Sequence, residues 1–243
     1  MTYSVSELQA NSRQNSVKKS AFKVGCIVLS TDLTIERDFA LLKDRYKAHF
    51  DFYINRIEFN NPINSQSLQN LLHQLDEASQ QILPGESLDA LVFNCTSASA
   101  LLGERAIKKS ISRRGIDILT TAQCCVNEIK KQKVKKLDLL CPYSQQVSQI
   151  LADYFVKQGL QVEHLYYLGI EDDRDIARIS HEQIIELAKK SVSAGSDGLF
   201  LSCTAMRVAE IIPEIETTIK RKVLSSNYCT FKQLLSLLEN KRG

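Results

Sequence analysis

The sequence predicts an α/β fold built from two similar Rossmann-like lobes with mostly parallel sheets, related by pseudo-two-fold symmetry. Two observations predict this fold. Short apolar runs alternate with longer amphipathic segments, which is typical of parallel strands joined by helical crossovers. The order of these segments then repeats once in the second half of the chain. At 243 residues, the chain is long enough to bury the cores of two such lobes.

The first lobe is expected over residues 22–130. Short apolar runs predict its strands, and helical spacing of apolar residues predicts its helices. The strands are expected at 23–29, 50–57 and 88–93, and the helices at 35–48, at 67–83 and directly after Cys95. The preceding segment, 1–21, is polar without a sustained apolar period, and we predict that it is a mobile tail.

The second lobe is expected over residues 131–243, because three runs of the first lobe recur there in the same order. Residues 24–29 correspond to 136–141, and 118–121 (ILTT) to 223–226 (VLSS). The run LDALVFNCT, which ends at Thr96, matches SDGLFLSCT, which ends at Thr204, 108 residues later. Such ordered matches indicate an internal duplication. The final helix is expected over 230–239, and it could pack back on the first lobe.

Composition and charge exclude several classes of protein. Hydrophobic residues make up 44% of the chain and charged residues 24%, as in an ordinary soluble protein, and the net charge is only +3. The basic run at 130–136 has no aromatic platform beside it, so we expect no nucleic-acid partner. No apolar run is long enough for a signal peptide or a membrane span, so we expect no membrane partner and a cytoplasmic protein.

Cofactor motifs are also missing from the sequence. There is no glycine-rich dinucleotide turn, no P-loop, no C-x-x-C pair and no nucleophile elbow, and the four histidines lack metal-ligand spacing. We therefore predict an enzyme without a cofactor or metal. The seven cysteines form no disulfide framework, so their thiols are available for chemistry.

Two of these cysteines, Cys95 and Cys203, occupy equivalent places in the repeat. Each is predicted at the carboxyl end of a central strand and directly before a helix, which is where open parallel sheets bind ligands. The amino end of a helix favours a bound carboxylate and lowers the pKa of a cysteine. The hydroxyls of Thr96, Ser97 and Thr204 are candidates for holding the same carboxylate.

If the lobes face each other, the two sulfurs approach a ligand from opposite sides. That arrangement suits removal of a proton on one face and its return on the other, or addition to a double bond. A lone cysteine after an apolar strand is more often a core residue. Four cysteines lack the repeat relationship and are interpreted as packing residues: Cys26, Cys124, Cys125 and Cys229. Cys141, at the end of a predicted strand, is left unassigned.

These residues together resemble the aspartate/glutamate racemase superfamily, and within it the maleate cis-trans isomerase, arylmalonate decarboxylase and ectoine-utilisation branch. The matching pieces span about residues 22–240 and are the run VGCIVLSTD at 24–32, the two Cys-Thr turns, Pro142-Tyr143 and VLSSN at 223–227. The resemblance implies that Cys95 and Cys203 carry the chemistry and that Tyr143 contacts the substrate.

The resemblance also bears on the reaction and the substrate. Arylmalonate decarboxylases resemble this chain but keep only the second cysteine, so Cys95 favours an isomerase or a racemase. Where maleate isomerases have asparagines, this chain has Asp32 and an aspartate at 172 or 173. An ionised aspartate repels a carboxylate, so a substrate with an amino or amide group fits better than maleate. The alternative for Asp32 is that it caps the following helix.

Three alternatives stay open from the sequence. The chain is also compatible with a carboxylate-binding or sensor protein without turnover, with an arylmalonate-type decarboxylase, and with a redox or flavodoxin-like protein. We expect a small carboxylate or an amino-acid-derived compound as the ligand. We also expect a homo-oligomer, either a dimer or a tetramer.

Overall fold

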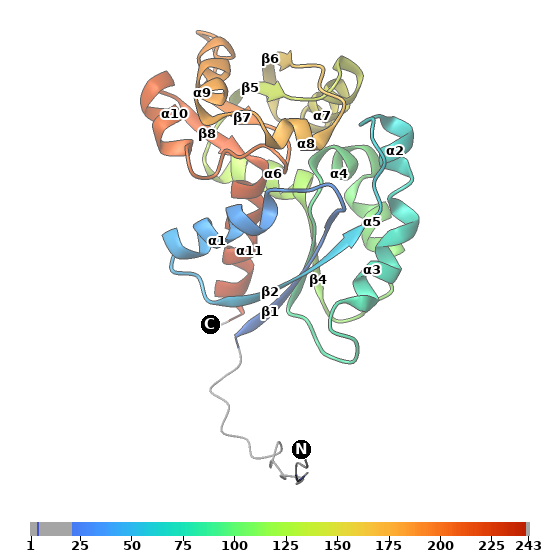
Figure 1. The fold of residues 1–243 in the computed structure, drawn as a ribbon. Helices are drawn as coiled ribbons and strands as arrows, with labels where there is room; N and C mark the ends of the chain where they lie inside the picture. The colour runs from blue at the N-terminus through green and yellow to red at the C-terminus, as the bar shows by residue number, and fades with distance from the viewer. Residues whose placement is uncertain (1–3, 5–20, 242–243) are drawn as a thin grey trace.

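The computed structural model of the chain describes residue 4 and residues 21–241. The mobile tail predicted at 1–21 therefore lies outside the described residues, apart from positions 4 and 21. The described chain forms two four-stranded sheets, each with helices packed around it (Figure 1).

The first sheet has the strand order β2-β1-β3-β4, and every pair of neighbouring strands is parallel. Its strands are β1 (Phe22–Leu29), β2 (Phe50–Ile57), β3 (Ala90–Phe93) and β4 (Asp117–Thr120). The second sheet repeats this topology as β6-β5-β7-β8, again with parallel pairs. Its strands are β5 (Lys136–Cys141), β6 (Gln161–Tyr167), β7 (Gly198–Leu201) and β8 (Lys222–Ser225). The predicted fold class of two similar α/β lobes is confirmed.

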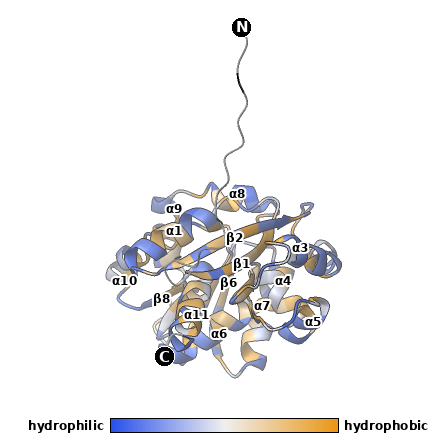
Figure 2. Cartoon of the chain, turned by 90° about the horizontal axis from the view of Figure 1, so that it is seen from below, coloured by the Kyte–Doolittle hydropathy of each residue, from blue (hydrophilic) through white to orange (hydrophobic). Residues whose placement is uncertain are grey.

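Helices connect the strands in both halves. Those before β5 are α1 (Ile35–Arg45), α2 (Ser65–Gln69), the 3₁₀ turn η1 (Leu72–Gln74), α3 (Leu75–Gln81), α4 (Thr96–Leu102), α5 (Glu104–Ser110) and α6 (Thr121–Lys131). Those after β5 are α7 (Gln145–Lys157), α8 (Asp173–Ala177), α9 (His181–Lys190), α10 (Ile212–Ile219) and α11 (Ser226–Asn240). Figure 2 shows hydrophobic residues along the strands and hydrophilic residues on many outer helix faces. Within the described chain, no helix has the length and apolar character to cross a membrane.

Two helices differ from their predicted bounds. The helix expected over 67–83 is three short pieces, α2, η1 and α3, and the bends between them keep Leu68, Leu71 and Leu75 all buried. The helix expected over 35–48 ends at Arg45, and Lys47 beyond it has a φ of 49°. That left-handed conformation cannot continue a right-handed helix.

The last helix, α11, packs on the first sheet although it follows the last strand of the second. Its buried side chains Phe231, Leu234 and Leu238 belong to one cluster with residues of β1 and α1. The rings of Phe231 and Phe39 meet edge to face, with 5.6 Å between their centroids. The same helix lies alongside α6 (Figure 1). Helix α11 therefore joins the two halves, and a lobe boundary at residues 130 and 131 stays a prediction.

Removing the Phe231 ring tests how much this junction stabilises the protein. The side chain is fully buried, so Phe231→Ala should lower the free energy of unfolding by about 3–5 kcal/mol. Urea denaturation followed by circular dichroism measures the change. Glu239→Ala on the exposed side of α11 is the matched control and should change stability by less than about 0.5 kcal/mol. Equal losses for both variants would contradict the packing role of α11.

Candidate active site

Cys95 lies where the first sheet ends and a helix begins. The four residues of β3 before it are fully buried, and Cys95 itself is the N-cap residue of α4 with 4% of its surface exposed. The Ser97 hydroxyl lies 3.7 Å from its sulfur, and the backbone N–H of Ala98 also points to that sulfur. The placement of Cys95 at the start of a helix is as the sequence predicts.

Cys203 follows β7, but the predicted helix directly after it is absent. The chain from Thr204 to Ile211 is irregular, and α10 begins only at Ile212, with Pro213 in its first turn. Cys203 has a φ of 90°, a left-handed conformation that turns the chain out of the strand without starting a helix. One backbone donor still reaches the sulfur, since the N–H of Ala205 lies 3.4 Å from it. The prediction of two equivalent helix starts is therefore wrong for the second cysteine.

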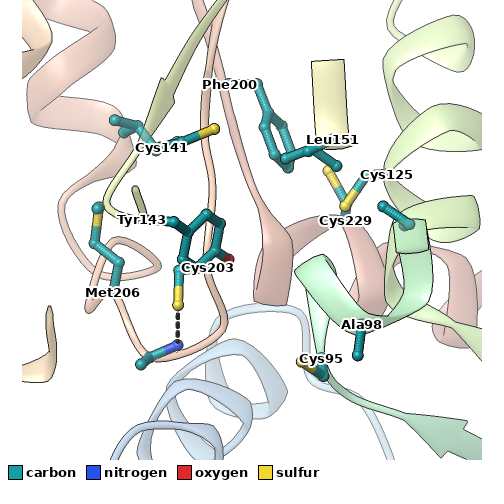
Figure 3. Close-up of a cluster of buried hydrophobic side chains, with 14 of the residues drawn as sticks. Cys95, Ala98, Cys125, Cys141, Tyr143, Leu151, Phe200, Cys203, Met206 and Cys229 are labelled. Carbon is teal, nitrogen blue, oxygen red and sulfur yellow. Dashed lines mark hydrogen bonds between the residues drawn. The ribbon is translucent and has the colours of Figure 1, made fainter. Parts of the chain in front are cut away.

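Both sulfurs face one narrow cavity between the two sheets. The space left in it for water-sized molecules is about 10 Å³, which is about the volume that one water needs. Its lining includes both cysteines and consists of Leu29, Phe59, Ile63, Leu68, Cys95, Thr96, Ser97, Tyr143, Asp173, Cys203, Thr204 and Ala205. Figure 3 shows Cys203 beside the ring of Tyr143 and Cys95 at the start of α4. In this structure the cavity is therefore smaller than a small carboxylate.

Two segments that carry lining residues are hydrogen-bonded to each other beside the cavity. The N–H of Ile63, in the segment after β2, donates to the carbonyl of Glu171, in the segment after β6, at 2.8 Å. The Asp173 carboxylate accepts from the Thr31 hydroxyl at 2.5 Å and from the Asn61 amide at 3.4 Å. These bonds link the first half of the chain to the second beside the cavity.

The thiols are held in their neutral form by burial. Desolvation raises the pKa of Cys95 to about 11, in spite of donation from the Ala98 N–H and the Ser97 hydroxyl. Burial also raises the pKa of Cys203, and negative charge on Cys95 raises it as well. Negative charge on Asp173 raises the pKa of both thiols. The expected lowering of both pKa values is wrong, because loss of water outweighs the few backbone donors at each sulfur. The two sulfurs favour a state in which at most one is ionised.

Tyr143 is a buried hydrogen-bond donor beside Cys203. Its side chain is 2% exposed, and burial raises its pKa well above the ordinary value, so the phenol keeps its proton. The phenol hydrogen-bonds to the Cys203 sulfur, and this bond favours a thiolate there. The Ser202 hydroxyl lies 3.4 Å from the phenol oxygen. Tyr143 is thus placed to stabilise negative charge on the sulfur or on a ligand oxygen.

The hydroxyl residues predicted from the Cys-Thr turns all line the cavity. Thr96, Ser97 and Thr204 are buried, and the Thr96 hydroxyl donates to Ser226 at 2.7 Å. Asp32 is also buried, but it is not among the lining residues of the cavity. Its Oδ1 accepts from the N–H groups of Thr34, the N-cap residue of α1, and of Ile35 at 2.8 and 2.9 Å, so it bonds to the backbone where α1 starts.

Asp173 is the charged residue that lines the cavity, and sequence reasoning could not choose it over Asp172. The structure separates the two, because Asp172 bonds to Arg174 at the start of α8 while Asp173 is 4% exposed and faces the sulfurs. Asn227 is a residue that sequence reasoning did not assign, although it ends the run VLSSN that was singled out. Among the described residues, no cluster of three His, Cys, Asp or Glu side chains fits a metal ion.

The reactivity of the thiols follows from their raised pKa values. Below their folded pKa both groups are thiols, so we expect slow alkylation of Cys95 and Cys203 by iodoacetamide at pH 7 and a rise in rate toward pH 11, with Cys95 ionising first. Peptide mapping by mass spectrometry at pH 7 to 10.5 measures each rate. Rapid alkylation at pH 7 with a midpoint below about 8.5 would contradict the dominance of burial.

The chain is similar in sequence and in fold to known enzymes. The arylmalonate decarboxylase family model matches residues 51–242. The maleate isomerase of Alcaligenes faecalis is 24% identical over 89% of this chain and 91% of its own length. The maleate isomerase of Geobacillus stearothermophilus is 23% identical over 90% and 93%. The arylmalonate decarboxylase of Bordetella bronchiseptica is 26% identical over 48% of this chain and 50% of its own length.

Solved structures show the same fold. The maleate isomerase Iso from Pseudomonas putida S16 superposes with a TM-score of 0.81 at 21% identity, covering 90% of this chain and 93% of that one. A cysteine-to-serine variant of the Nocardia farcinica maleate cis-trans isomerase has the same score at 19% identity and the same coverage, and contains a covalently bound succinylcysteine intermediate. A crystal structure of arylmalonate decarboxylase has a TM-score of 0.66 at 19% identity, over 88% and 92% of the two chains.

Proposed function

The chain belongs to the arylmalonate decarboxylase family, and on that premise we propose that it is a cofactor-independent isomerase or racemase in which Cys95 and Cys203 act on a small carboxylate. The observation that carries this proposal is that both sulfurs line one cavity at the carboxyl ends of two parallel sheets. The family membership agrees with the resemblance inferred from the Cys-Thr turns. The curated relatives of nearly full length are maleate isomerases.

In the isomerase version, one sulfur forms a temporary covalent bond. The thiolate adds to one carbon of a cis double bond, and the electron pair moves to the neighbouring carbon and its carboxylate. The former double bond then rotates as a single bond, the carbon–sulfur bond breaks, and the trans double bond forms again. The succinylcysteine found in the Nocardia farcinica relative is consistent with such an adduct. The other thiol is placed to give a proton to the carbanion and to take it back.

In the racemase version, no carbon–sulfur bond forms. One thiolate removes the proton from the α-carbon, and the thiol on the opposite face delivers its own proton, so the configuration inverts. Negative charge on Cys95 raises the pKa of Cys203, which supports one thiolate paired with one thiol in either version. We assign carboxylate binding to the Tyr143 phenol and to the Ser97 and Thr204 hydroxyls, which line the cavity. The Thr96 hydroxyl also lines it but would join them only by giving up its bond to Ser226.

The substrate is further restricted by the carboxylate of Asp173. This group is buried beside both sulfurs, and its partners in the structure, Thr31 and Asn61, are neutral. A second carboxylate on the ligand would be repelled at this position, whereas an ammonium group would be attracted. We therefore propose an amino-acid-derived substrate over maleate. A link to ectoine utilisation, a cytoplasmic location and a dimer or tetramer remain predictions.

Two other functions give different results in the same assays. An arylmalonate-type decarboxylase would release carbon dioxide from a substituted malonate, and retention of Cys95 beside Cys203 disfavours this alternative. A binding or sensor protein would hold the carboxylate without turnover. Proton NMR in D₂O with maleate, aspartate, glutamate and 2,4-diaminobutyrate separates the versions, because racemisation places deuterium on the α-carbon whereas addition and elimination need not.

The cysteine roles are tested by single substitutions. Cys95→Ser and Cys203→Ser should each lower kcat by about a hundredfold to ten-thousandfold, because each removes one of the two groups that exchange the proton or form the adduct. Turnover in the NMR assay measures the loss. Cys124→Ala, a buried cysteine outside the cavity lining, is the matched control and should keep nearly full activity. Full activity in both serine variants would exclude the two-cysteine mechanism.

The substrate preference is tested at Asp173. Asp173→Asn removes the negative charge and supplies an amide donor, so we expect kcat/KM for an amino-acid substrate to fall about tenfold and kcat/KM for maleate to rise. Asp175→Asn, an exposed aspartate of α8 that pairs with Arg178, is the control and should change neither. A parallel fall for both substrates would mean that Asp173 does not select the charge of the ligand.

A further inference from the structure

The turn that carries Cys203 has little local structure to hold it. Cys203 has a φ of 90°, which is unfavourable for a residue with a side chain, and the residues that follow form no helix until Ile212. A backbone conformation of this kind persists only where its surroundings impose it. The position of the Cys203 sulfur is therefore set by bonds from residues distant in the sequence.

Two side chains from elsewhere in the chain hold the turn by its carbonyl groups. The Thr34 hydroxyl donates to the carbonyl of Ala205 at 2.7 Å. The Asn227 side-chain amide donates to the carbonyl of Thr204 at 2.8 Å. Thr34 and Asn227 are 0% and 1% exposed, so water does not compete with either bond. Each bond fixes a carbonyl within two residues of the sulfur.

Asn227 also reaches the turn of the other cysteine. Its Nδ2 donates to Asp38 at 2.9 Å as well as to Thr204, and its Oδ1 accepts from the Asn94 side chain at 3.2 Å. A carboxyl oxygen and a carbonyl oxygen on one side require the NH₂ group there, so the amide has only one orientation that satisfies all three bonds. Asn94 directly precedes Cys95. One amide thus lies between the two cysteine turns and bonds to both.

The neighbouring residue of the same helix adds a second tie to the Cys95 turn. The Ser226 hydroxyl accepts from Thr96 at 2.7 Å, so the residues on both sides of Cys95 bond to the first turn of α11. Only the second half of the repeat has this arrangement. The first half has Thr121-Ala122 at the start of α6, where the second half has Ser226-Asn227 at the start of α11. An alanine has no group that bonds to both turns.

We propose that Asn227 is a positioning residue that sets the place of the Cys203 sulfur relative to the Cys95 sulfur. This inference rests on the proposed two-cysteine function, since the separation of the sulfurs matters only if both act on one ligand. A displacement of about 1 Å in a catalytic group costs up to about a hundredfold in rate. Because the Cys95 turn also begins a helix and the Cys203 turn does not, loss of Asn227 acts mainly on Cys203.

Asn227→Asp tests the proposal with almost no change in shape. The carboxylate still accepts from Asn94 but no longer donates to Thr204, and it meets the Asp38 carboxyl. We expect kcat to fall about a hundredfold with KM changed less than threefold. We also expect the ratio of iodoacetamide alkylation rates, Cys203 to Cys95, to rise about tenfold as the freed turn opens. Asn127→Asp on the exposed face of α6 is the control and should change neither.

A second substitution separates positioning from stability. In Asp38→Asn with Asn227→Asp, the amide at 38 donates to the carboxylate at 227, so the buried contact and the melting temperature should recover. The carbonyl of Thr204 still lacks its donor, so the raised alkylation ratio and the lowered kcat should persist. Recovery of the ratio and kcat together with the melting temperature would show that Asn227 only stabilises the fold, and would overturn the proposal.

A third variant keeps the outcome decisive. If the double variant does not fold, Asn227→Ser is measured in the same way, because it removes the amide without adding a charge. An unchanged alkylation ratio in that variant overturns the proposal. The ratio is read with iodoacetamide and needs no substrate. It therefore reports on Asn227 even if Cys95→Ser and Cys203→Ser show that the proposed function is wrong.

Discussion

Helix α11 is formed by the end of the chain but buries Phe231, Leu234 and Leu238 against β1 and α1, which are formed by its beginning. This apolar contact fixes where the first turn of α11 lies. Ser226 and Asn227 are carried to the junction of the two halves, where they bond to residues next to Cys95 and Cys203. Apolar packing on the first sheet thus determines the geometry of the polar contacts made by the first turn of α11. Without that packing, neither the separation of the sulfurs nor the narrow cavity would be defined.

The same burial that fixes the geometry decides the protonation of the site. Removing water from a thiol disfavours its charge, and the single backbone N–H that reaches each sulfur, from Ala98 or Ala205, offsets only part of this cost. Neutral thiols are protected from side reactions while the cavity is filled by its own side chains. Negative charge on Cys95 also raises the pKa of Cys203, so the site disfavours two thiolates at once.

The duplication produces two similar sheets but not two equivalent sites. Cys95 begins a helix with an extended backbone, whereas Cys203 has a left-handed backbone and depends on distant hydrogen bonds. Asp173 adds a charge on the side of the second half. These differences distinguish the faces of any ligand between the sulfurs. They are compatible with an enzyme whose two cysteines have different roles, one held by local structure and one placed by hydrogen bonds from residues distant in the sequence.

The sequence by itself determined the fold class and the pairing of Cys95 with Cys203. Both depend on local patterns, since the alternation of strands and helices and the repeated LDALVFNCT and SDGLFLSCT runs are read from neighbouring residues. Only the tertiary structure decided that no helix follows Cys203, that both thiols have raised pKa values, and that Asp173 lines the cavity. The same holds for Asn227, which bonds to Asp38 from 189 positions away. Burial and such distant partners arise when the two halves pack together, and no local pattern records which side chains then meet.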